Sequence, residues 1–304
     1  MPMKTPPVID IQNLVYRYDR REAVDGLSLQ VEPGQCHGLL GRNGAGKTTT
    51  IKCLLNLLRP QSGSVSVFGL SPGRREAAIK ERLAYVPDSV AFYPWMTVRD
   101  ALDYQASFRR HWNRKIEAEL LGRFQLDPRL ATTALSKGQR TQVALIGAVC
   151  PEPELLVLDE PTSGLDPLVR RDFIQTVIGA YQDAAPGERT VLVSTHLISE
   201  FEGLMDRFTI VDHGKAILTA NADDARSRYR RLRAEFGNDA PDASAVPGAR
   251  TLRREGRWLE LMVNGEAESV IAWLQSAKAL RVESETLALE DIFMAAVGTK
   301  GGLP

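Results

Sequence analysis

Hydrophobic and polar residues alternate along the first part of the chain, over residues 8–36, and the pattern returns over 61–69. Alternation with a period of two is typical of strands that bury one face, so these segments are predicted to form antiparallel strands covering one side of a core. Three short and largely apolar runs, 35–40, 155–158 and 190–194, indicate buried core strands. Four consecutive apolar residues, as in 155–158, are typical of a parallel sheet covered on both faces.

Helical patterns lie between these strands. We expect helices over residues 48–58, 97–109, 115–124 and 139–149, with Thr97 as the N-cap of the second one. The middle two belong to a helical region of about 88–137, after which strands and helices alternate again as far as residue 218. The first 220 residues are therefore predicted to form an α/β domain.

The composition changes after residue 220. A helix is predicted over residues 222–235, and it carries five arginines: Arg226, Arg228, Arg230, Arg231 and Arg233. We interpret this run as a solvated helix face, with contact to anionic lipid headgroups as the alternative. A polar linker over 237–249, a strand over 257–263 and helices over 266–274 and 289–297 complete a small α+β module, residues 221–304, in which we find no chemical motif.

The segment from Gly41 to Thr48 fits the phosphate-loop pattern G-x-x-x-x-G-K-[ST]. Its glycines allow the backbone to turn sharply and to approach a ligand closely. The N–H groups of such a loop converge on phosphate oxygens, and the following helix adds the positive end of its dipole. Lys47 is predicted to reach the terminal phosphates, and the Thr48 hydroxyl to ligate Mg²⁺. A chance glycine-rich turn is the alternative, but the strand before the loop and the helix after it argue against this.

Two carboxylates, Asp159 and Glu160, follow the apolar run 155–158. The carboxyl end of a parallel strand is where open α/β sheets place their ligands. Asp159 suits a Mg²⁺ shell, because this ion prefers a few hard carboxylate contacts and keeps its waters. Glu160 is predicted to polarise the attacking water. His196 follows the strand over 190–194, where a lone histidine is more often structural than functional.

Composition limits the possible partners. The chain has 304 residues, of which 43% are hydrophobic and 25% charged, as in ordinary globular proteins. Its 38 basic and 38 acidic residues give no net charge, so bulk electrostatic binding to nucleic acid is not indicated. No apolar run approaches the roughly 18–20 residues of a membrane helix, and the first residues lack an apolar signal segment. We expect a cytosolic chain that reaches a membrane only through a partner.

Five elements occur in order over roughly residues 8–220: the phosphate loop, Leu-Ser-Lys-Gly-Gln at 135–139, Asp159-Glu160, Ser-Gly-Leu-Asp at 163–166, and His196. With this order and spacing, the chain resembles the ATP-binding subunit of an ABC transporter. The phosphate loop alone would not exclude kinases or GTPases, whereas the segment at Ser136 separates this family from them. The resemblance implies a P-loop NTPase core with an antiparallel β subdomain and a helical subdomain, about residues 88–137.

The resemblance also implies a role for each motif. Asp159 and Glu160 correspond to the Walker B pair, residues 163–166 to the D-loop, and His196 to the switch histidine that senses the γ-phosphate. Nucleotide contacts are implied for Tyr18, Gly41, Asn43, Gly44, Ala45, Gly46, Lys47, Thr48, Thr49, Ser136, Gly138 and Gln139. In this set, Tyr18 stacks on the adenine, residues 41–49 form the Walker A loop, and the signature residues 136, 138 and 139 contact ATP held by a second subunit. Plain packing with Tyr16 is the alternative for Tyr18.

Asp88 departs from the family pattern, which usually has glutamine and sometimes glutamate after the strand that reads Leu-Ala-Tyr-Val-Pro here. An aspartate at this position can bind Mg²⁺ or its water, or it can only shape the loop, and both interpretations stay open. The apolar segment Phe92–Met96 follows it. This segment either packs the helical subdomain or forms a patch that receives a membrane subunit.

The implied function is an ATPase subunit that uses ATP and Mg²⁺ to drive a separate transmembrane permease. The short helical region favours an exporter. Two such subunits, identical or different, are expected to pair head-to-tail around two ATP molecules at the cytoplasmic face of the membrane. A soluble ABC-type ATPase acting on ribosomes or DNA is the alternative, which the single cassette and the lack of sustained heptads disfavour. The sequence does not name the cargo.

Overall fold

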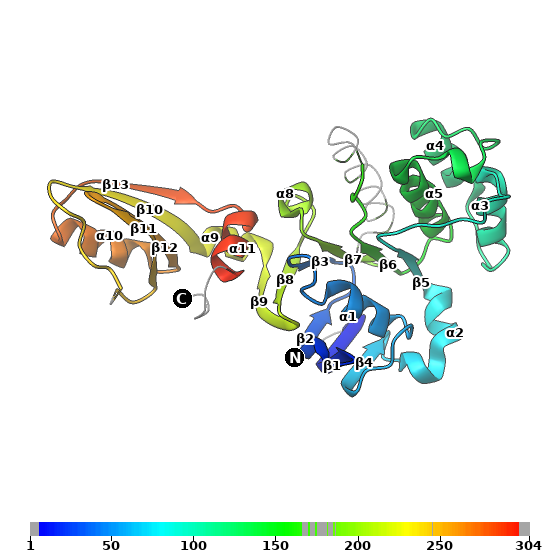
Figure 1. Cartoon of the computed structure of the whole chain (residues 1–304), viewed down its shortest axis with the longest axis horizontal. Helices are drawn as coiled ribbons and strands as arrows, with labels where there is room; N and C mark the ends of the chain where they lie inside the picture. The colour runs from blue at the N-terminus through cyan, green and yellow to red at the C-terminus, as the bar shows by residue number, and fades with distance from the viewer. Residues whose placement is uncertain are drawn as a thin grey trace. The chain divides into compact units, whose positions relative to one another are not determined.

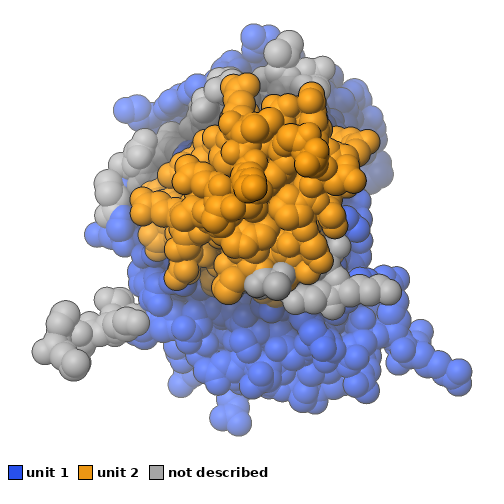
Figure 2. Space-filling model, turned by 90° about the vertical axis from the view of Figure 1, so that its left-hand side faces the viewer, with its two compact units in different colours: residues 1–216 blue, residues 217–304 orange. Residues whose placement is uncertain are grey.

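The computed structural model describes residues 6–165, 170, 174, 181, 185, 187–244 and 246–297. The chain divides into two compact units, residues 1–216 and 217–304, which Figure 2 shows in blue and orange. The boundary that we predict after residue 220 falls inside β9 (Lys215–Asn221), the strand through which the chain passes from one unit to the other.

The N-terminal strands of the first unit form a three-stranded antiparallel sheet in the order β2-β1-β4 (Figure 1). The strands are β1 (Ile9–Tyr18), β2 (Arg21–Val31) and β4 (Ser62–Val67). Ile9 pairs with Val31 on one side and Val67 on the other, and all three side chains are fully buried. The alternating pattern therefore predicts these strands correctly, because one face of the sheet packs on the core.

A second sheet has the order β5-β6-β7-β3-β8-β9 and holds the buried strands. Its first five strands are β3 (Cys36–Leu40), β5 (Leu83–Val86), β6 (Leu155–Asp159), β7 (Thr190–Thr195) and β8 (Arg207–Asp212). The pairs β5–β6, β6–β7, β7–β3 and β3–β8 are all parallel. Every residue of β3, β6 and β7 is buried, as the short apolar runs predict.

The helices of this unit follow the sequence pattern, with shifted ends. They are α1 (Lys47–Leu54), α2 (Pro72–Arg82), α3 (Val98–Ala106), α4 (Arg114–Arg123), α5 (Lys137–Val149) and α8 (Ile198–Phe201), with a short 3₁₀ turn at Thr132–Ala134. Thr97 caps α3 as predicted, whereas α2 has no counterpart among the predicted helices. Helices α3 and α4 both contact α5, and the three lie together in Figure 1. None of the helices in the described part of the chain has the length and hydrophobicity needed to cross a membrane.

The second unit is a four-stranded antiparallel sheet, in the order β11-β12-β10-β13. Its elements are α9 (Ala222–Arg228), β10 (Tyr229–Phe236), β11 (Ala249–Glu255), β12 (Trp258–Asn264), α10 (Ala267–Ser276), β13 (Ala279–Thr286) and α11 (Leu289–Val297). Val270 and Leu274 of α10 pack in one core cluster with strand residues such as Leu261.

The predicted helix over 222–235 is wrong, because the helix ends at Arg228 and β10 follows. Leu232, Ala234 and Phe236 alternate with charged residues, and this period of two buries them in the core. Arg231 and Arg233 extend from the other face and pair with carboxylates on neighbouring strands. Tertiary pairing thus overrides the helix propensity of an arginine- and alanine-rich segment.

Candidate active site

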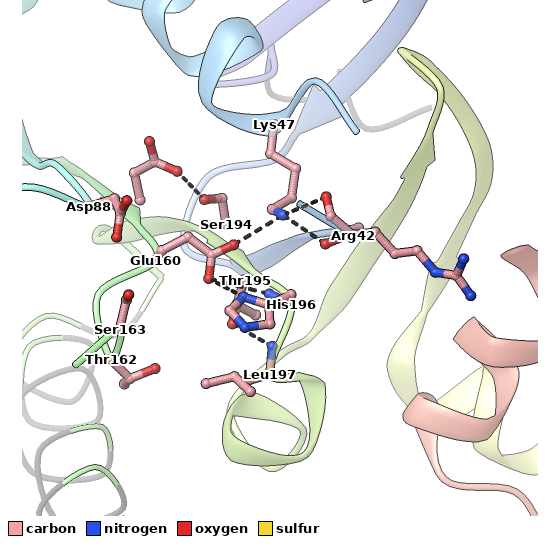
Figure 3. A network of polar contacts seen from close by, with 12 residues as sticks. Arg42, Lys47, Asp88, Glu160, Thr162, Ser163, Ser194, Thr195, His196 and Leu197 are labelled. Carbon is pink, nitrogen blue, oxygen red and sulfur yellow. Dashed lines mark hydrogen bonds and ion pairs between the residues drawn. The ribbon is translucent and has the colours of Figure 1, made fainter. Parts of the chain in front are cut away.

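Three neighbouring strands of the parallel sheet end at one edge, and predicted site residues follow each of them. β3 leads into loop 41–46 and α1, while Asp159 ends β6 and Thr195 ends β7. Because β7 pairs in parallel with both β3 and β6, the carboxyl ends of the three strands lie side by side. This edge brings together Lys47, Glu160 and His196, which are far apart in the sequence (Figure 3).

The loop before α1 has the backbone that its glycines predict. Gly44 and Gly46 have φ values of 81° and 110°, in the region that favours glycine. A Cβ placed on Gly46 would lie 2.4 Å from the carbonyl oxygen of Ala23, so no larger residue fits. Gly46 is also the N-cap of α1 and offers no side-chain cap. The first N–H groups of α1 therefore lie at a helix start that suits an anion.

Lys47, Glu160 and His196 form a chain of polar contacts. Figure 3 shows Lys47 reaching toward Glu160, with His196 against the same carboxylate. The Lys47 Nζ lies 3.0 Å from Glu160 Oε1, and His196 Nδ1 lies 2.8 Å from Glu160 Oε2. Lys47 Nζ also donates to the carbonyl oxygens of Gly41 and Arg42, at 2.7 and 3.3 Å. Only 5% of the Lys47 side chain and 11% of the Glu160 side chain are exposed, so this pair is largely desolvated.

Glu160 adopts a backbone conformation that is rare outside glycine, with φ of 49°. Its N–H donates to the carbonyl oxygen of Ser194 at 2.9 Å, which anchors the turn after β6 to β7. Such conformations persist where the surrounding structure enforces them, and they cluster at functional sites.

Asp159 is fully buried and contacts Thr48, in the first turn of α1. Its Oδ1 accepts hydrogen bonds from Thr48 Oγ1, at 3.1 Å, and from Ser194 Oγ. Its Oδ2 is buried and has no hydrogen-bond partner among the described residues. Burial raises the pKa of Asp159, the bonds from Ser194 and Thr48 lower it in part, and the charges of Glu160 and Asp88 raise it again. An unpaired buried carboxylate oxygen is costly unless a ligand satisfies it.

The segment at Ser136 starts α5 with a reciprocal cap. Ser136 Oγ accepts from the N–H of Gln139 at 3.2 Å, and Gln139 Oε1 accepts from the N–H of Ser136 at 3.0 Å. A Cβ on Gly138 would lie 2.8 Å from Leu165 Cδ2, so this helix start packs tightly against the turn after β6. Ser136 itself is exposed. Asp166, the last residue of the predicted D-loop 163–166, lies outside the described residues.

Tyr18 stands at the end of β1 with 43% of its surface exposed. Its ring meets that of Tyr16 edge to face, with centroids 4.8 Å apart. The ring is thus both packed and accessible, which leaves both interpretations from the sequence in place.

The segment 92–96 has features of both predicted interpretations, packing of the helical subdomain and an exposed apolar patch. Met96 is buried, whereas Tyr93 and Trp95 are 54% and 71% exposed. Tyr93 stacks on Trp95 and meets Tyr104 edge to face, and Tyr104 in turn meets Phe108. We call these four residues the aromatic surface. Beside it lies a cavity of about 440 Å³, lined by side chains that include Tyr85, Val90 and Phe92.

Comparison with known proteins gives the family. A family model described as ABC transporter matches residues 24–163, and one described as an AAA domain, putative AbiEii toxin of a Type IV TA system, matches 127–201. The Nod factor export ATP-binding protein I of Burkholderia pseudomallei (strain K96243) is 33% identical over 306 residues, covering 95% of this chain and 97% of that protein. This chain belongs to the ATP-binding subunits of ABC transporters.

Other relatives of this ABC ATPase agree with that assignment. The daunorubicin resistance ATP-binding protein DrrA3 of Streptomyces coeruleorubidus is 32% identical over 302 residues, covering 92% of this chain and 91% of that protein. A solved ATP-binding subunit of an ABC transporter superposes with a TM-score of 0.64 at 28% identity, covering 72% of this chain and 92% of the other. The predicted family, the α/β P-loop fold and the ATPase class are thus confirmed.

The structure of this ABC ATPase also reveals a contact that the motifs did not indicate. Lys137, inside the predicted signature segment 135–139, lies with its Nζ 3.7 Å from Asp88 Oδ1 and donates to Ser163 Oγ at 3.0 Å. The sequence offers one signal for this contact, two charges of opposite sign at the two ends of the predicted helical region 88–137. Asp88 is thus paired with a lysine, and its predicted metal contact stays a prediction.

Proposed function

We propose that this ABC ATPase powers a separate transmembrane permease of an exporter, with Lys47, Asp159, Glu160 and His196 as its chemical groups. The observation that carries the proposal is the chain of contacts from the largely buried pair Lys47 and Glu160 to the partly exposed His196, at 3.0 and 2.8 Å, beside a phosphate loop. Phosphoryl transfer requires mainly positioning and neutralisation of charge, and this cluster supplies both.

ATP would place its phosphates in loop 41–46, against the backbone N–H groups of residues 43–49. Lys47 then exchanges its carboxylate partner for phosphate oxygens, since a triphosphate carries more negative charge than one glutamate. Glu160, released from Lys47, accepts a hydrogen bond from the attacking water. His196 remains on the opposite oxygen of Glu160 and reaches the γ-phosphate. Charge on the transferring group would thus be neutralised by Lys47 and the helix start.

The residues present fit a Mg²⁺ ion. Within the described part of the chain, no group of three or more His, Cys, Asp or Glu side chains is arranged to hold a metal. Mg²⁺, however, is commonly bound by one or two protein oxygens, substrate phosphates and waters. Thr48 Oγ1 and the unpaired Oδ2 of Asp159 offer two such oxygens. When bound, the ion would neutralise charge on the phosphates, and Asp88 remains a weaker candidate for its outer shell.

Tyr18 would stack on the adenine. Its ring is exposed and stands at the end of β1, just before the turn at Asp19. Stacking on a base requires an accessible aromatic face held by neighbouring packing, and the contact with Tyr16 supplies that support.

Two subunits would trap the nucleotide between them. Ser136, Gly138 and Gln139 lie at the start of α5, whose N–H groups and dipole favour an anion. The capping box already satisfies part of that helix start, so the exposed Ser136 would meet a phosphate only when a second subunit presents one. Each ATP would then become part of the interface between subunits.

The permease would dock on the aromatic surface, next to Asp88. Large exposed apolar side chains in one cluster mark interaction sites on soluble domains, and the cavity of about 440 Å³ beside them offers room for a partner's side chains. The names of the relatives, Nod factor export and daunorubicin resistance, support an exporter. Such docking would place the chain peripherally at the cytoplasmic face of the membrane.

A test of this arrangement uses Ser136→Arg in the full chain. The variant should bind ATP with the affinity of the parent, because its own phosphate loop is unchanged, and should lose Mg²⁺-dependent hydrolysis. Ser107→Arg, an exposed serine at the end of α3, is the matched control and should hydrolyse ATP normally. Loss of ATP binding by Ser136→Arg in calorimetry would contradict a contact made only between subunits.

A further inference from the structure

Lys137 is the first residue of α5 and lies between Ser136 and Gly138. Its ammonium group reaches two loops, with Ser163 Oγ at 3.0 Å and Asp88 Oδ1 at 3.7 Å. Its aliphatic stem also covers Gly164, where a Cβ would lie 2.7 Å from Lys137 Cδ. Gly164 has φ of 85°, a backbone conformation that favours glycine, and a larger residue would also have to displace the lysine stem.

A lysine in this position works against the helix. The N-terminus of a helix carries a partial positive charge, so a cation in the first turn is unfavourable. The first turn of α5 contains no acidic residue that would offset it. The compensating charge comes from Asp88, which lies far away in the sequence and on another element. Helix stability therefore does not explain the lysine, whereas a link between elements does.

The two loops that Lys137 reaches follow neighbouring strands. Asp88 lies just after β5 and Ser163 just after β6, and these strands pair in parallel with Val86 opposite Leu158. Lys137 thus connects the start of α5 to the carboxyl ends of two core strands. The close contact of Gly138 with Leu165 fastens the same helix start to the same turn. A shift of the segment Ser136–Gly138 would therefore alter its contacts with the Asp88 loop and with the turn at Ser163.

We propose that Lys137 is a positioning residue, which holds the signature segment of α5 in register with the Asp88 loop and the turn at Ser163. It thereby sets where Ser136 and Gly138 face the nucleotide of a second subunit. The inference rests on the proposed role of the Ser136 segment. It also gives Asp88 a partner other than Mg²⁺. A displacement of the loop that holds Asp88, next to the aromatic surface, would then displace the signature segment through Lys137.

The test compares variants of the full chain in two assays, the kcat for Mg-ATP hydrolysis and the Kd for ATP. Lys137→Met keeps the stem over Gly164 and removes the charge. Both partners are about half exposed, at 52% and 48%, so the pair is modest in strength. We expect kcat to fall about three- to fivefold with an unchanged Kd. Lys137→Arg should restore most of the rate, since it restores the charge.

Controls separate positioning from general effects. Lys115→Met removes an exposed lysine from the first turn of α4 and should leave kcat unchanged. Thermal unfolding of Lys137→Met should match that of the parent, which shows that the variant folds. The difference in kcat between Lys137→Met and the parent should shrink at about 1 M salt, where the Debye length is about 3 Å and the ion pair is screened.

The link to Asp88 is tested by a double-mutant cycle. Asp88→Asn combined with Lys137→Met should be no slower than the slower single variant, because both changes break one contact. Multiplied losses, or a Lys137→Met variant as fast as the parent, would overturn the proposal. A higher Mg²⁺ requirement in Asp88→Asn, whatever stands at 137, would make Asp88 a metal-shell residue and overturn it as well. A parent chain without any hydrolysis would instead refute the proposed function.

Discussion

Two ion pairs, Lys47–Glu160 in the first unit and Arg281–Glu283 in the second, lie under opposite conditions of burial. In residues 1–216, the Lys47 and Glu160 side chains are 5% and 11% exposed. In residues 217–304, Arg281 and Glu283 pair at 2.6 Å with 71% and 51% of their side chains exposed. Taking charges out of water is costly, and the attraction within a buried pair only partly repays it. The buried pair is therefore explained by its chemistry, whereas the exposed pair is an ordinary feature of a solvated sheet.

Buried polar atoms without a hydrogen-bond partner among the described residues occur in both units. In the first unit, His37 on β3 is fully buried with an unpartnered Nδ1, and Asp159 keeps an unpartnered Oδ2. In the second unit, Arg231 pairs with three carboxylates, Glu260, Glu285 and Asp291, although its buried Nε makes no hydrogen bond to a described residue. Removing His37 or one of the buried charges around loop 41–46 should consequently alter catalysis or the pH response, whereas removing a solvent-exposed charge of the second unit should alter very little. The predictions below test this difference, from the largest effect to the smallest.

Glu160→Gln should lower kcat by about 10²- to 10⁴-fold, the usual contribution of a general base. Glutamine keeps the shape but replaces one carboxylate oxygen with an NH₂ group, which donates and does not accept, so it cannot polarise water as a carboxylate does. ATP affinity should be retained, because Glu160 does not hold the triphosphate. Glu154→Gln, which alters a half-exposed glutamate paired with Arg82, is the control and should keep the parent rate. A Glu160→Gln variant slowed less than about tenfold would contradict the assignment of the base.

Lys47→Met should weaken ATP binding by about 10- to 100-fold, because hydrogen bonds to charged groups contribute about 1.5–3 kcal/mol. The measurement is calorimetric titration with ATP. Lys52→Met changes a second lysine on the same helix, in its last turn, and should bind ATP as the parent does. Equal affinities of parent and Lys47→Met would mean that the phosphates do not reach this loop.

His37 should make the first unit sensitive to acid. Burial lowers the pKa of His37 from 6.5 to about 3, with the charge of Arg207 adding to the effect. Above pH 6.5 neither state takes up the proton, so stability is unaffected. As the pH falls from 6.5 toward 3, only the unfolded chain is protonated, and the folded state loses stability.

The His37 prediction can be measured by hydrogen exchange of the β3 amides. Between pH 7.5 and 5.5, the parent should lose about 1.4 kcal/mol more than His37→Gln, since one pH unit below the unfolded pKa corresponds to about that amount. Glutamine can still bond to Thr209, which lies 3.0 Å from His37 Nε2. The same pH dependence in both proteins would show that His37 is protonated in the folded state too.

The sequence predicts best those features of the site that are encoded locally. The phosphate loop and the pair Asp159-Glu160 are encoded locally, because glycine spacing sets a backbone and an apolar run sets a buried strand. The contact between Glu160 and His196 depends on β6 and β7 being neighbours, which no local pattern states. The reach of Lys137 to Asp88 and Ser163 requires three elements to meet, so motif analysis passes over it.

The second unit is predicted less well, because its edge strands lack a distinct pattern. β13 is exposed along most of its length, and β11 is largely exposed, so neither shows the alternation that marks a half-buried strand. β10 does alternate, but its arginines and alanine favour a helix when read by propensity. Only pairing with β12 and β13 reveals which of its faces is buried.

The smallest effect is expected from Arg281→Ala in the second unit. Exposed ion pairs contribute about 0–1 kcal/mol, because water already solvates both charges and the side chains lose freedom when they pair. The free energy of unfolding of the second unit, followed by hydrogen exchange of the β10 amides, should thus change by less than about 0.5 kcal/mol. Glu283→Ala should behave alike, and the double variant should match the sum of the two within about 0.5 kcal/mol. A loss well above 1 kcal/mol on removing Arg281 would mean that this surface pair contributes substantially to stability, and the distinction between the buried pair Lys47–Glu160 and this solvated pair would no longer hold.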